Sequence, residues 1–388
     1  MSSSLHLKKG IEMLNRKRST KELSEEIKEA IENPAEPEIK EMLSVKQVIS
    51  TGSTWLDLAI CGERIHGGGV PGGCFMEISG PEASGKSALL AEMCGNVQAK
   101  GGDSSFKDPE YRIDEEYCHI YGMKLDKKNY TTPDTVEEVF EEIEKWTPQP
   151  RVLGAINFEG VDSLASLSTD MEMEDEDKMG QRRAKMFSQG FRKTCRLIKK
   201  RNILLACSNQ MRDGKYGDTT PGGRAIKYYA SLRIGLKILE EITKTIDISE
   251  TPQKEEQKEM TRRERMKAQK EAKEKGEKPD KNKFVKSIGI LTECAVKKSS
   301  VGEPYRKAKI YIIFGYGIDD IRGNLAYIKE MKNINGYLCP DGKTYLSLEQ
   351  AVLHVEEQNL VADLKEQTIT LWEAINNKFK TDRKPKER

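Results

Sequence analysis

The sequence predicts an α/β fold built on a mostly parallel central sheet. Short apolar runs alternate along the chain with longer stretches of helical periodicity, which is typical of a parallel sheet with helices on both faces. One apolar run leads through a glycine-rich loop directly into a helical stretch, the local order strand, loop, helix. The 388 residues suffice for one large domain with smaller pieces at each end.

The elements follow in order. Leu5 to Met42 has the pattern of two charged helices with a break at Asn33-Pro34, which predicts an N-terminal arm over residues 1–47. Residues 48–323 hold the alternating elements and should form the core. The expected strands are Cys74–Ile78, Val152–Phe158, Ile203–Ser208, Ser231–Leu239, Ile288–Val296 and Lys309–Phe314. The expected helices are Ser87–Lys100, Thr135–Trp146 and Ala184–Lys200.

Residues 240–286 are dense in Glu and Lys and almost free of aromatic residues, so they cannot bury a core. We expect a charged, partly disordered insertion there, in which Thr261 to Lys275 has the pattern of an exposed helix. Residues 324–379 have helical periodicity around a hairpin at Gly336 to Tyr345, and predict a small C-terminal α/β domain. Residues 380–388 form a basic tail.

Composition excludes several classes of protein. No apolar run is long enough to span a bilayer, and Met1 to Lys9 lacks a signal-peptide core, so we expect a cytoplasmic protein without a membrane partner. The eight cysteines are scattered without C-x-x-C pairs, which argues against a zinc site or a disulfide framework. Net charge is only +2, but Gln181 to Arg201 is strongly basic, and such stretches bind phosphate or form a solvated face.

The glycine-rich loop is a candidate nucleotide site. Its sequence, Gly80-Pro81-Glu82-Ala83-Ser84-Gly85-Lys86-Ser87, fits G-x-x-x-x-G-K-[ST] between a strand and a helix. Glycines let backbone N–H groups turn inward around phosphate oxygens, and the helix N-terminus adds a favourable dipole. Lys86 would reach the β- and γ-phosphates of ATP, and the Ser87 hydroxyl would bind Mg²⁺. The alternative is a chance glycine-rich turn.

Hydrolysis needs further groups, and here the residues leave alternatives open. Asp162 follows an apolar run and could support the metal, or it could be a helix N-cap. Glu110 is a candidate general base by its spacing from the loop. Gln210 ends another apolar run. It could sense the γ-phosphate, or it could be an ordinary surface glutamine. The acids that compete with Glu110 are Asp108, Asp114, Glu115 and Glu116.

Several strings in the same order resemble the bacterial RecA recombinase family, including its phage-encoded (UvsX-like) members. Besides the phosphate loop, they are Ile49-Ser50-Thr51-Gly52-Ser53, Phe106-Lys107-Asp108-Pro109-Glu110-Tyr111, Val161-Asp162-Ser163, Asn209-Gln210-Met211-Arg212, Thr220-Pro221-Gly222-Gly223, Ala225 to Ser231 and Phe314-Gly315-Tyr316-Gly317-Ile318. The resemblance runs from about Ile49 to Gly323 and more weakly through the C-terminal piece. It implies a RecA-like P-loop ATPase core.

The resemblance also implies roles for single residues. Glu110 would be the catalytic base, Asp162 the Mg²⁺-linked acid, and Gln210 the switch between γ-phosphate and DNA. Lys297 would act on the γ-phosphate across a subunit interface, to which Lys227 and Tyr228 would also belong. The adenine would lie near Asp114, Tyr117 and Phe314. DNA would be bound by two loops and their flanks, at Met179, Gly180, Arg183, Arg192, Arg212, Gly222, Gly223 and Arg224.

The activity that the resemblance implies is ATP-dependent strand exchange. The protein would form a helical filament on single-stranded DNA with ATP and Mg²⁺, pair it with duplex DNA, and work with single-strand-binding and loading proteins. A RecA-fold ATPase of another kind, such as a ring helicase or a regulatory ATPase, is an alternative. So is a DNA-coating filament protein that hydrolyses ATP poorly. The sequence departs from the family in its insertion, its basic tail and its unclear second interface lysine, for which Lys298 is a candidate.

Overall fold

The computed structural model describes residues 47–169, 179–211, 223–247, 258–261, 283–381 and 383. The predicted N-terminal arm and the last residues of the basic tail lie outside this range. No helix in the described part of the chain has the length and apolar character needed to cross a bilayer.

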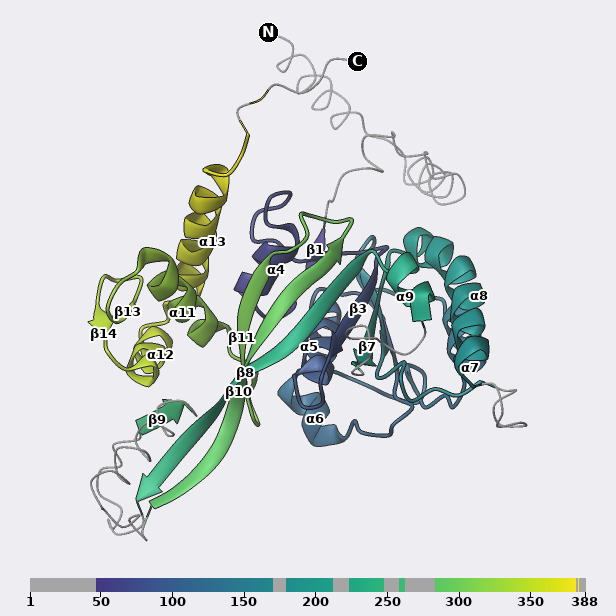
Figure 1. Ribbon diagram of the computed structural model, residues 1–388, viewed down its shortest axis with the longest axis horizontal. Helices are drawn as coiled ribbons and strands as arrows, with labels where there is room; N and C mark the ends of the chain where they lie inside the picture. Colours follow the sequence, from purple (N-terminus) through teal and green to yellow (C-terminus); the bar gives the residue numbers. More distant parts are fainter. Residues whose placement is uncertain are drawn as a thin grey trace, which may run out of the picture. The chain divides into compact units, whose positions relative to one another are not determined.

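A ten-stranded sheet lies at the centre of the fold (Figure 1), in the order β12-β11-β10-β8-β3-β7-β6-β4-β5, with β9 paired to β8. The strands from β8 to β5 run parallel, and the others add antiparallel pairs at one side. The predicted α/β class with a mostly parallel central sheet is therefore confirmed. The strands are β3 (Phe75–Gly80), β4 (Ser104–Lys107), β5 (Tyr130–Thr131), β6 (Asn157–Val161), β7 (Ile203–Gln210), β8 (Leu232–Asp247), β9 (Lys258–Thr261), β10 (Lys283–Ser299), β11 (Lys307–Ile313) and β12 (Gly317–Ile318). A separate two-stranded sheet pairs β1 (Val48–Ile49) with β2 (Val70–Pro71).

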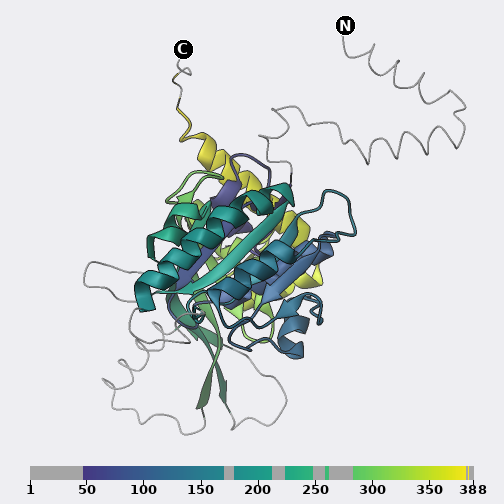
Figure 2. The ribbon, with the colours of Figure 1, turned by 90° about the vertical axis from the view of Figure 1, so that its right-hand side faces the viewer.

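Helices cover both faces of the parallel strands. One face carries α7, α8 and α9, which Figure 2 shows in front of the sheet, and α5 packs against the parallel strands from the other. The core helices are α4 (Thr54–Cys61), α5 (Lys86–Ala99), α6 (Glu115–Ile120), α7 (Val136–Lys145), α8 (Met179–Lys200) and α9 (Gly223–Tyr229).

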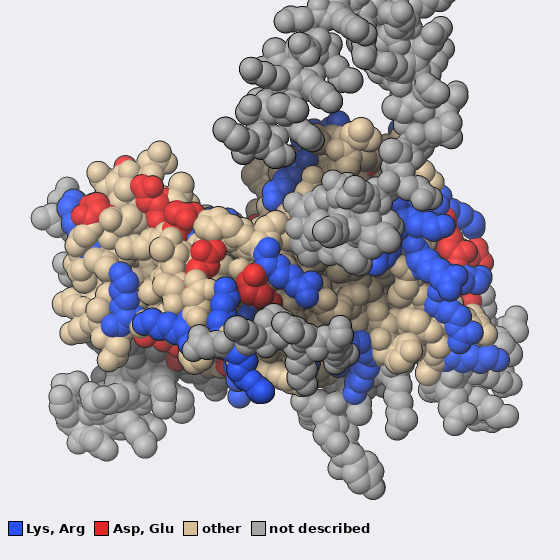
Figure 3. Space-filling view, turned by 90° about the horizontal axis from the view of Figure 1, so that it is seen from above, with Lys and Arg blue, Asp and Glu red and all other residues tan. Residues whose placement is uncertain are grey.

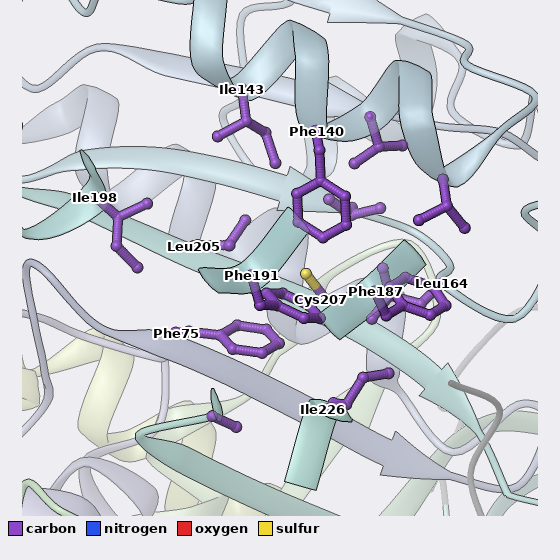
Figure 4. Packing of buried hydrophobic residues seen from close by; sticks show 14 of the residues in the cluster. Phe75, Phe140, Ile143, Leu164, Phe187, Phe191, Ile198, Leu205, Cys207 and Ile226 are labelled. Carbon is purple, nitrogen blue, oxygen red and sulfur yellow. The ribbon is translucent and has the colours of Figure 1, made fainter. Parts of the chain in front are cut away.

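Aromatic rings fill the layer between the sheet and the α7–α8 pair (Figure 4). Phe191 of α8 stacks on Phe75 of β3 with ring centroids 4.3 Å apart, and Phe140 of α7 meets Phe191 edge-on at 4.9 Å. Gly190 makes this approach possible, because a Cβ there would lie 2.1 Å from the Phe140 ring. Offset and edge-to-face pairs of this kind add to the hydrophobic free energy of burial.

The expected strand over residues 152–158 is displaced in the structure, where β6 covers Asn157–Val161. Leu153 is fully exposed, whereas Asn157 and Glu159 are buried within the strand. The prediction was wrong because it took polar residues as interruptions. Burial of such groups is tolerated when they are paired: Asn157 bonds to backbone groups at 3.0 and 3.1 Å, and Glu159 is ion-paired at 2.9 Å with the lysine that ends β4.

The predicted insertion is shorter than residues 240–286. Residues 240–247 belong to β8 and 283–286 to β10, and the two strands stay paired as far as Asp247 opposite Lys283. Thr261 lies in β9, and the rest of the predicted helix to Lys275 lies outside the described residues. Cross-strand hydrogen bonds satisfy the backbone of these charged stretches without a core of their own.

The C-terminal piece contains α11 (Asp320–Lys332), α12 (Leu348–Glu357) and α13 (Val361–Asn377), which share an apolar cluster. The predicted hairpin is confirmed as β13 (Tyr337–Leu338) and β14 (Thr344–Tyr345). The proposed domain border between residues 323 and 324 falls inside α11, a helix that contacts α4 and β11 as well as α12 and α13.

Candidate nucleotide site

The phosphate loop joins β3 to α5, as predicted. Gly85 precedes the helix with φ +94°, a conformation that favours glycine, and a Cβ there would lie 2.1 Å from Ile312 Cδ1. Lys86 Nζ lies within the loop and donates to the carbonyl oxygens of Gly80 at 3.1 Å and Pro81 at 2.6 Å. Burial lowers the pKa of Lys86, and the nearby Asp162 and Glu82 oppose that shift. The Lys86 ammonium group is therefore held within the loop by two backbone carbonyl oxygens.

Asp162 stands directly after β6 and faces the first turn of α5. Its carboxylate accepts hydrogen bonds from the Ser208 hydroxyl of β7 and from the Ser87 hydroxyl of α5. Burial raises the pKa of Asp162, and these two hydrogen bonds oppose the shift. The N-cap alternative is wrong, because residues 164–166 form a turn and not a helix. Ser87 and Asp162 together present oxygen atoms, which are the ligands that Mg²⁺ prefers.

Glu110 is held on both carboxylate oxygens. Oε1 accepts a hydrogen bond of 2.8 Å from Ser163 Oγ, and Oε2 forms an ion pair with Arg112. Its charge acts on both Lys86 and Asp162. The fixed carboxylate therefore lies near Lys86 of the phosphate loop and near Asp162, a predicted metal residue.

The competing acids are engaged elsewhere. Asp108 is buried and accepts from the backbone N–H groups of Arg112 and Ile113 and from the Tyr130 hydroxyl, at 2.8 to 2.9 Å. Asp114 caps α6 through a hydrogen bond of 2.7 Å from the backbone N–H of Tyr117. The remaining two, Glu115 and Glu116, are exposed in the first turn of α6. Glu110 is the acid of this group whose charge acts on both Lys86 and Asp162.

Gln210 ends β7 directly opposite Gly80 of the phosphate loop. The next residue, Met211, donates its backbone N–H to the Gly80 carbonyl at 3.3 Å. The end of β7 is further tied to β3 through Glu77, which accepts from Asn209 Nδ2 at 3.0 Å and pairs with Arg233 at 2.5 Å. The phosphate loop and the end of β7 are therefore joined by strand pairing and by backbone and side-chain hydrogen bonds.

Lys297 and Lys298 have different surroundings. Lys297 is the extra residue where the pairing of β10 with β8 shifts register, and its Nζ lies 4.0 Å from Met211 Sδ. Lys298 Nζ donates to the carbonyl oxygens of Lys227 at 3.0 Å and Tyr228 at 2.9 Å, at the end of α9. In this structure, Lys298, the suggested second interface lysine, stabilises a helix C-terminus of its own chain.

Of the predicted adenine positions, Asp114 lines a cleft beside α6, whereas Tyr117 and Phe314 are not among the residues that line it. Asp114 lines it together with Gly315, the neighbour of Phe314, so that α6 and the β11–β12 turn face each other. The Phe314 side chain is 59% exposed. Tyr117 packs against Tyr121 with ring centroids 4.9 Å apart. Asp114 and Gly315, more than 190 positions apart in the sequence, thus line the same cleft.

The two predicted DNA loops leave the same edge of the sheet. One lies between β6 and α8, the other between β7 and α9, and α8 and α9 pack together. Arg183 donates to the Ala165 carbonyl at 3.4 Å, and Arg192 is exposed on α8. Lys227 and Tyr228 are exposed on α9. Arg212 and Gly222 lie outside the described residues. Met179 and Gly180 begin α8, and Gly223 and Arg224 begin α9; the structure describes only the backbone of these four residues.

Three residues of the site escaped the sequence analysis: Ser208, Ser163 and Arg112. Each contacts a predicted residue but was given no role, although Ser163 stands in the string Val161-Asp162-Ser163. Ser208 gave a weak signal, as a hydroxyl at the polar end of an apolar run. Their roles depend on contacts between strands, which spacing along the chain does not reveal.

Comparison with known proteins identifies the family of the chain. A family model described as the RecA N-terminal domain matches residues 35–259. The chain is 32% identical to Protein RecA of Delftia acidovorans over 280 residues, 70% of this chain and 63% of that protein. It is 31% identical to Protein RecA of Thermus thermophilus over 281 residues (71% and 69%), and 32% identical to that of Staphylococcus aureus over 277 residues (69% and 66%). The match thus spans about two thirds of each relative's length. Because the family model covers more than half of its residues, and relatives at least 31% identical are matched over about two thirds of their length, this chain belongs to the RecA family.

Proposed function

We propose that this protein is an ATP-dependent DNA recombinase, which forms a filament on single-stranded DNA and exchanges strands with homologous duplex DNA. The observation that carries the proposal is the convergence of Lys86, Ser87, Glu110, Asp162 and Gln210 at one edge of a RecA-family core. A phosphate-binding loop alone would support nucleotide binding. The fixed carboxylate beside it supports hydrolysis.

Each residue has a distinct part in the proposed reaction. Backbone N–H groups of the loop and Lys86 would hold the phosphates of ATP, and Ser87 with Asp162 would hold Mg²⁺. When bound, the metal supplies positive charge that neutralises the phosphate oxygens. Glu110 would accept a proton from the attacking water at a carboxylate oxygen, while Arg112 and Ser163 keep that carboxylate in place.

The link to DNA would run through β7. Gln210 adjoins the phosphate loop and is followed at once by the second predicted DNA loop, so the state of the nucleotide can bias DNA affinity. Lys227, Tyr228 and Lys297 would complete the nucleotide site of a neighbouring subunit in the filament. We further propose the phage-encoded, UvsX-like branch, which the insertion and basic tail support, and action in a bacterial or phage-infected cytoplasm with single-strand-binding and loading proteins.

The test is ATP hydrolysis by the full-length protein with and without single-stranded DNA, over a salt series. Stimulation by DNA that fades as salt rises is expected, because phosphate contacts release counterions. Turnover that ignores DNA would contradict the recombinase and favour a RecA-fold ATPase with another partner. Electron microscopy completes the test: open filaments on DNA are expected, and closed rings would indicate a ring helicase.

A further inference from the structure

The outer face of α8 carries a row of cations. Its buried side is made of Phe187, Phe191, Thr194 and Ile198, which pack towards the sheet. At 3.6 residues per turn, the opposite side is formed by residues 185, 192, 196 and 199, with 200 beside them. All five are exposed, and all are basic: Lys185, Arg192, Arg196, Lys199 and Lys200.

This row differs from an ordinary solvated helix face. Such faces mix both charges, usually as i,i+4 ion pairs, but α8 contains neither Asp nor Glu from Met179 to Lys200. Lys193, at the edge of the face, reaches a carboxylate, Glu144 of α7 at 3.8 Å, and none of the five cations of the row forms an ion pair within the described part of the chain. Viewed from above, Lys and Arg side chains gather on the side of the molecule where α8 lies (Figure 3). The five cations are therefore free to act together on an external polyanion.

We propose that the outer face of α8 is a track for the phosphate backbone of double-stranded DNA, which extends from Arg192 through Arg196 to Lys199 and Lys200. The row from Lys185 to Lys200 is about 22 Å long at 1.5 Å per residue, with a cation at nearly every turn after Arg192. Arg196 lies about one turn, and Lys199 and Lys200 about two turns, beyond Arg192, the last residue of α8 that the sequence predicts to bind DNA.

The chemistry of the face selects duplex DNA. Single-stranded DNA is usually held by aromatic side chains on which its bases stack, but both aromatic residues of α8, Phe187 and Phe191, are buried on the other side. The track offers point charges and no stacking surface. Duplex DNA suits it, because its bases are enclosed and its phosphates form a dense outer line of charge.

The test compares duplex binding by the full-length wild type and by the triple variant Arg196→Gln, Lys199→Gln, Lys200→Gln over a salt series. Gln keeps the helix propensity close to that of Lys and Arg. Each lost phosphate contact should reduce the slope of log K against log salt by about 0.9, so we expect a decrease between about 2 and 3. The conservative variant Arg196→Lys should keep the wild-type slope.

A matched control removes three positive charges elsewhere, with Lys127→Gln, Lys128→Gln and Lys332→Gln, all exposed residues off α8. Its duplex slope should equal that of the wild type. An unchanged slope in the α8 variant, or an equal decrease in the control, would overturn the track; an acidic protein as the true partner would give the first result. The track rests on the proposed function, but different measurements contradict the two proposals. Loss of DNA-stimulated hydrolysis in the wild type contradicts the recombinase, whereas the duplex slope decides the track.

Discussion

Glu110 owes its position to two neighbours that come from different parts of the chain. Arg112 follows it in the same loop, and Ser163 comes from the end of β6. A carboxylate fixed at both oxygens loses little conformational entropy when a water is placed beside it. This preorganisation distinguishes Glu110 from the exposed acids of α6.

Replacing Glu110 with Gln should remove the proton acceptor while it preserves the size of the side chain. We expect DNA-stimulated ATP turnover to fall by at least about 100-fold. ATP-dependent binding to single-stranded DNA should persist, because the phosphate loop is intact. The measurements are steady-state hydrolysis and DNA affinity, with Glu116→Gln as the control. Normal turnover in the Glu110 variant would move the base to another acid, such as Glu115.

Ser208 orients Asp162 from the neighbouring strand, which predicts an effect on metal binding. Ser208→Ala leaves Asp162 with one hydroxyl donor fewer. The Mg²⁺ concentration for half-maximal hydrolysis should rise by about 10-fold or more, since partners that orient metal ligands have effects of this size. Ser300→Ala, which removes a hydroxyl bonded to the Ser231 carbonyl at 3.1 Å, is the control. An equal Mg²⁺ requirement in both variants would exclude this role of Ser208.

At the scale of elements, the close contact of α7 with α8 depends on one glycine in a helix interior. Glycine costs about 1 kcal/mol relative to alanine there, so its presence needs a packing reason. Gly190 supplies the reason by admitting the Phe140 ring. The same contact fixes the rotation of α8, and with it the direction of the cationic face.

Gly190→Ala should therefore destabilise the protein by about 1–3 kcal/mol through overpacking against Phe140. Gly323→Ala in α11 is the matched control, because a Cβ there would meet no atom within 4 Å. That variant should be neutral, or more stable by up to about 1 kcal/mol. Urea unfolding measures both. Equal effects of the two substitutions would show that α7 and α8 can separate to accept the methyl group.

A pH dependence follows from α5, where Glu92 faces two other carboxyl groups. Burial, assisted by the charges of Asp320 and Asp57, raises the pKa of Glu92 from 4.5 to about 7. The folded state thus binds the proton more tightly, and this stabilisation is present below pH 4.5 and lost as pH rises through about 7. The wild type should therefore lose free energy of unfolding between pH 5 and pH 8, and Glu92→Gln should not. The free energy of unfolding of the variant, relative to that of the wild type, should rise by about 2 kcal/mol over this range. Urea unfolding at both pH values checks this, with the exposed Glu115→Gln as control; a difference that is constant with pH would contradict it.

At the scale of the molecule, the long β8–β10 hairpin extends beyond the helix-covered sheet (Figure 1). Asp247 and Lys283 face each other at the end of the described pairing. Near this end, Ile246 is 42% and Phe284 63% exposed in the structure. The core clusters lie elsewhere, so the chain between these strands should be dispensable for folding.

Replacing residues 248–282 by Asn-Gly tests whether the core folds without this segment. The dipeptide is chosen because it favours the two-residue turn that a hairpin requires. We expect an unchanged urea midpoint and wild-type ATP turnover. The lost pairing of β9 with β8 removes few contacts from the core. Aggregation or a lower midpoint would show instead that the removed segment protects the exposed end of the hairpin. The same replacement with Gly-Ser separates an effect of turn geometry from one of the deleted segment.

The sequence by itself determined the α/β class, the phosphate loop and the order of the site strings, since these depend on local periodicity and on a motif of adjacent residues. Spacing placed Glu110 among five acids, and only the family resemblance singled it out. The sequence also displaced β6, because buried polar residues look like breaks until their partners are known. Only the tertiary structure decided these points. In the folded chain, Asp108 and Asp114 form other hydrogen bonds and Glu159 is paired with Lys107. Lys298 donates to carbonyl oxygens at the end of α9. Each of these outcomes depends on groups from different strands and helices, whose distance in space is set by the sheet order and not by their separation along the chain.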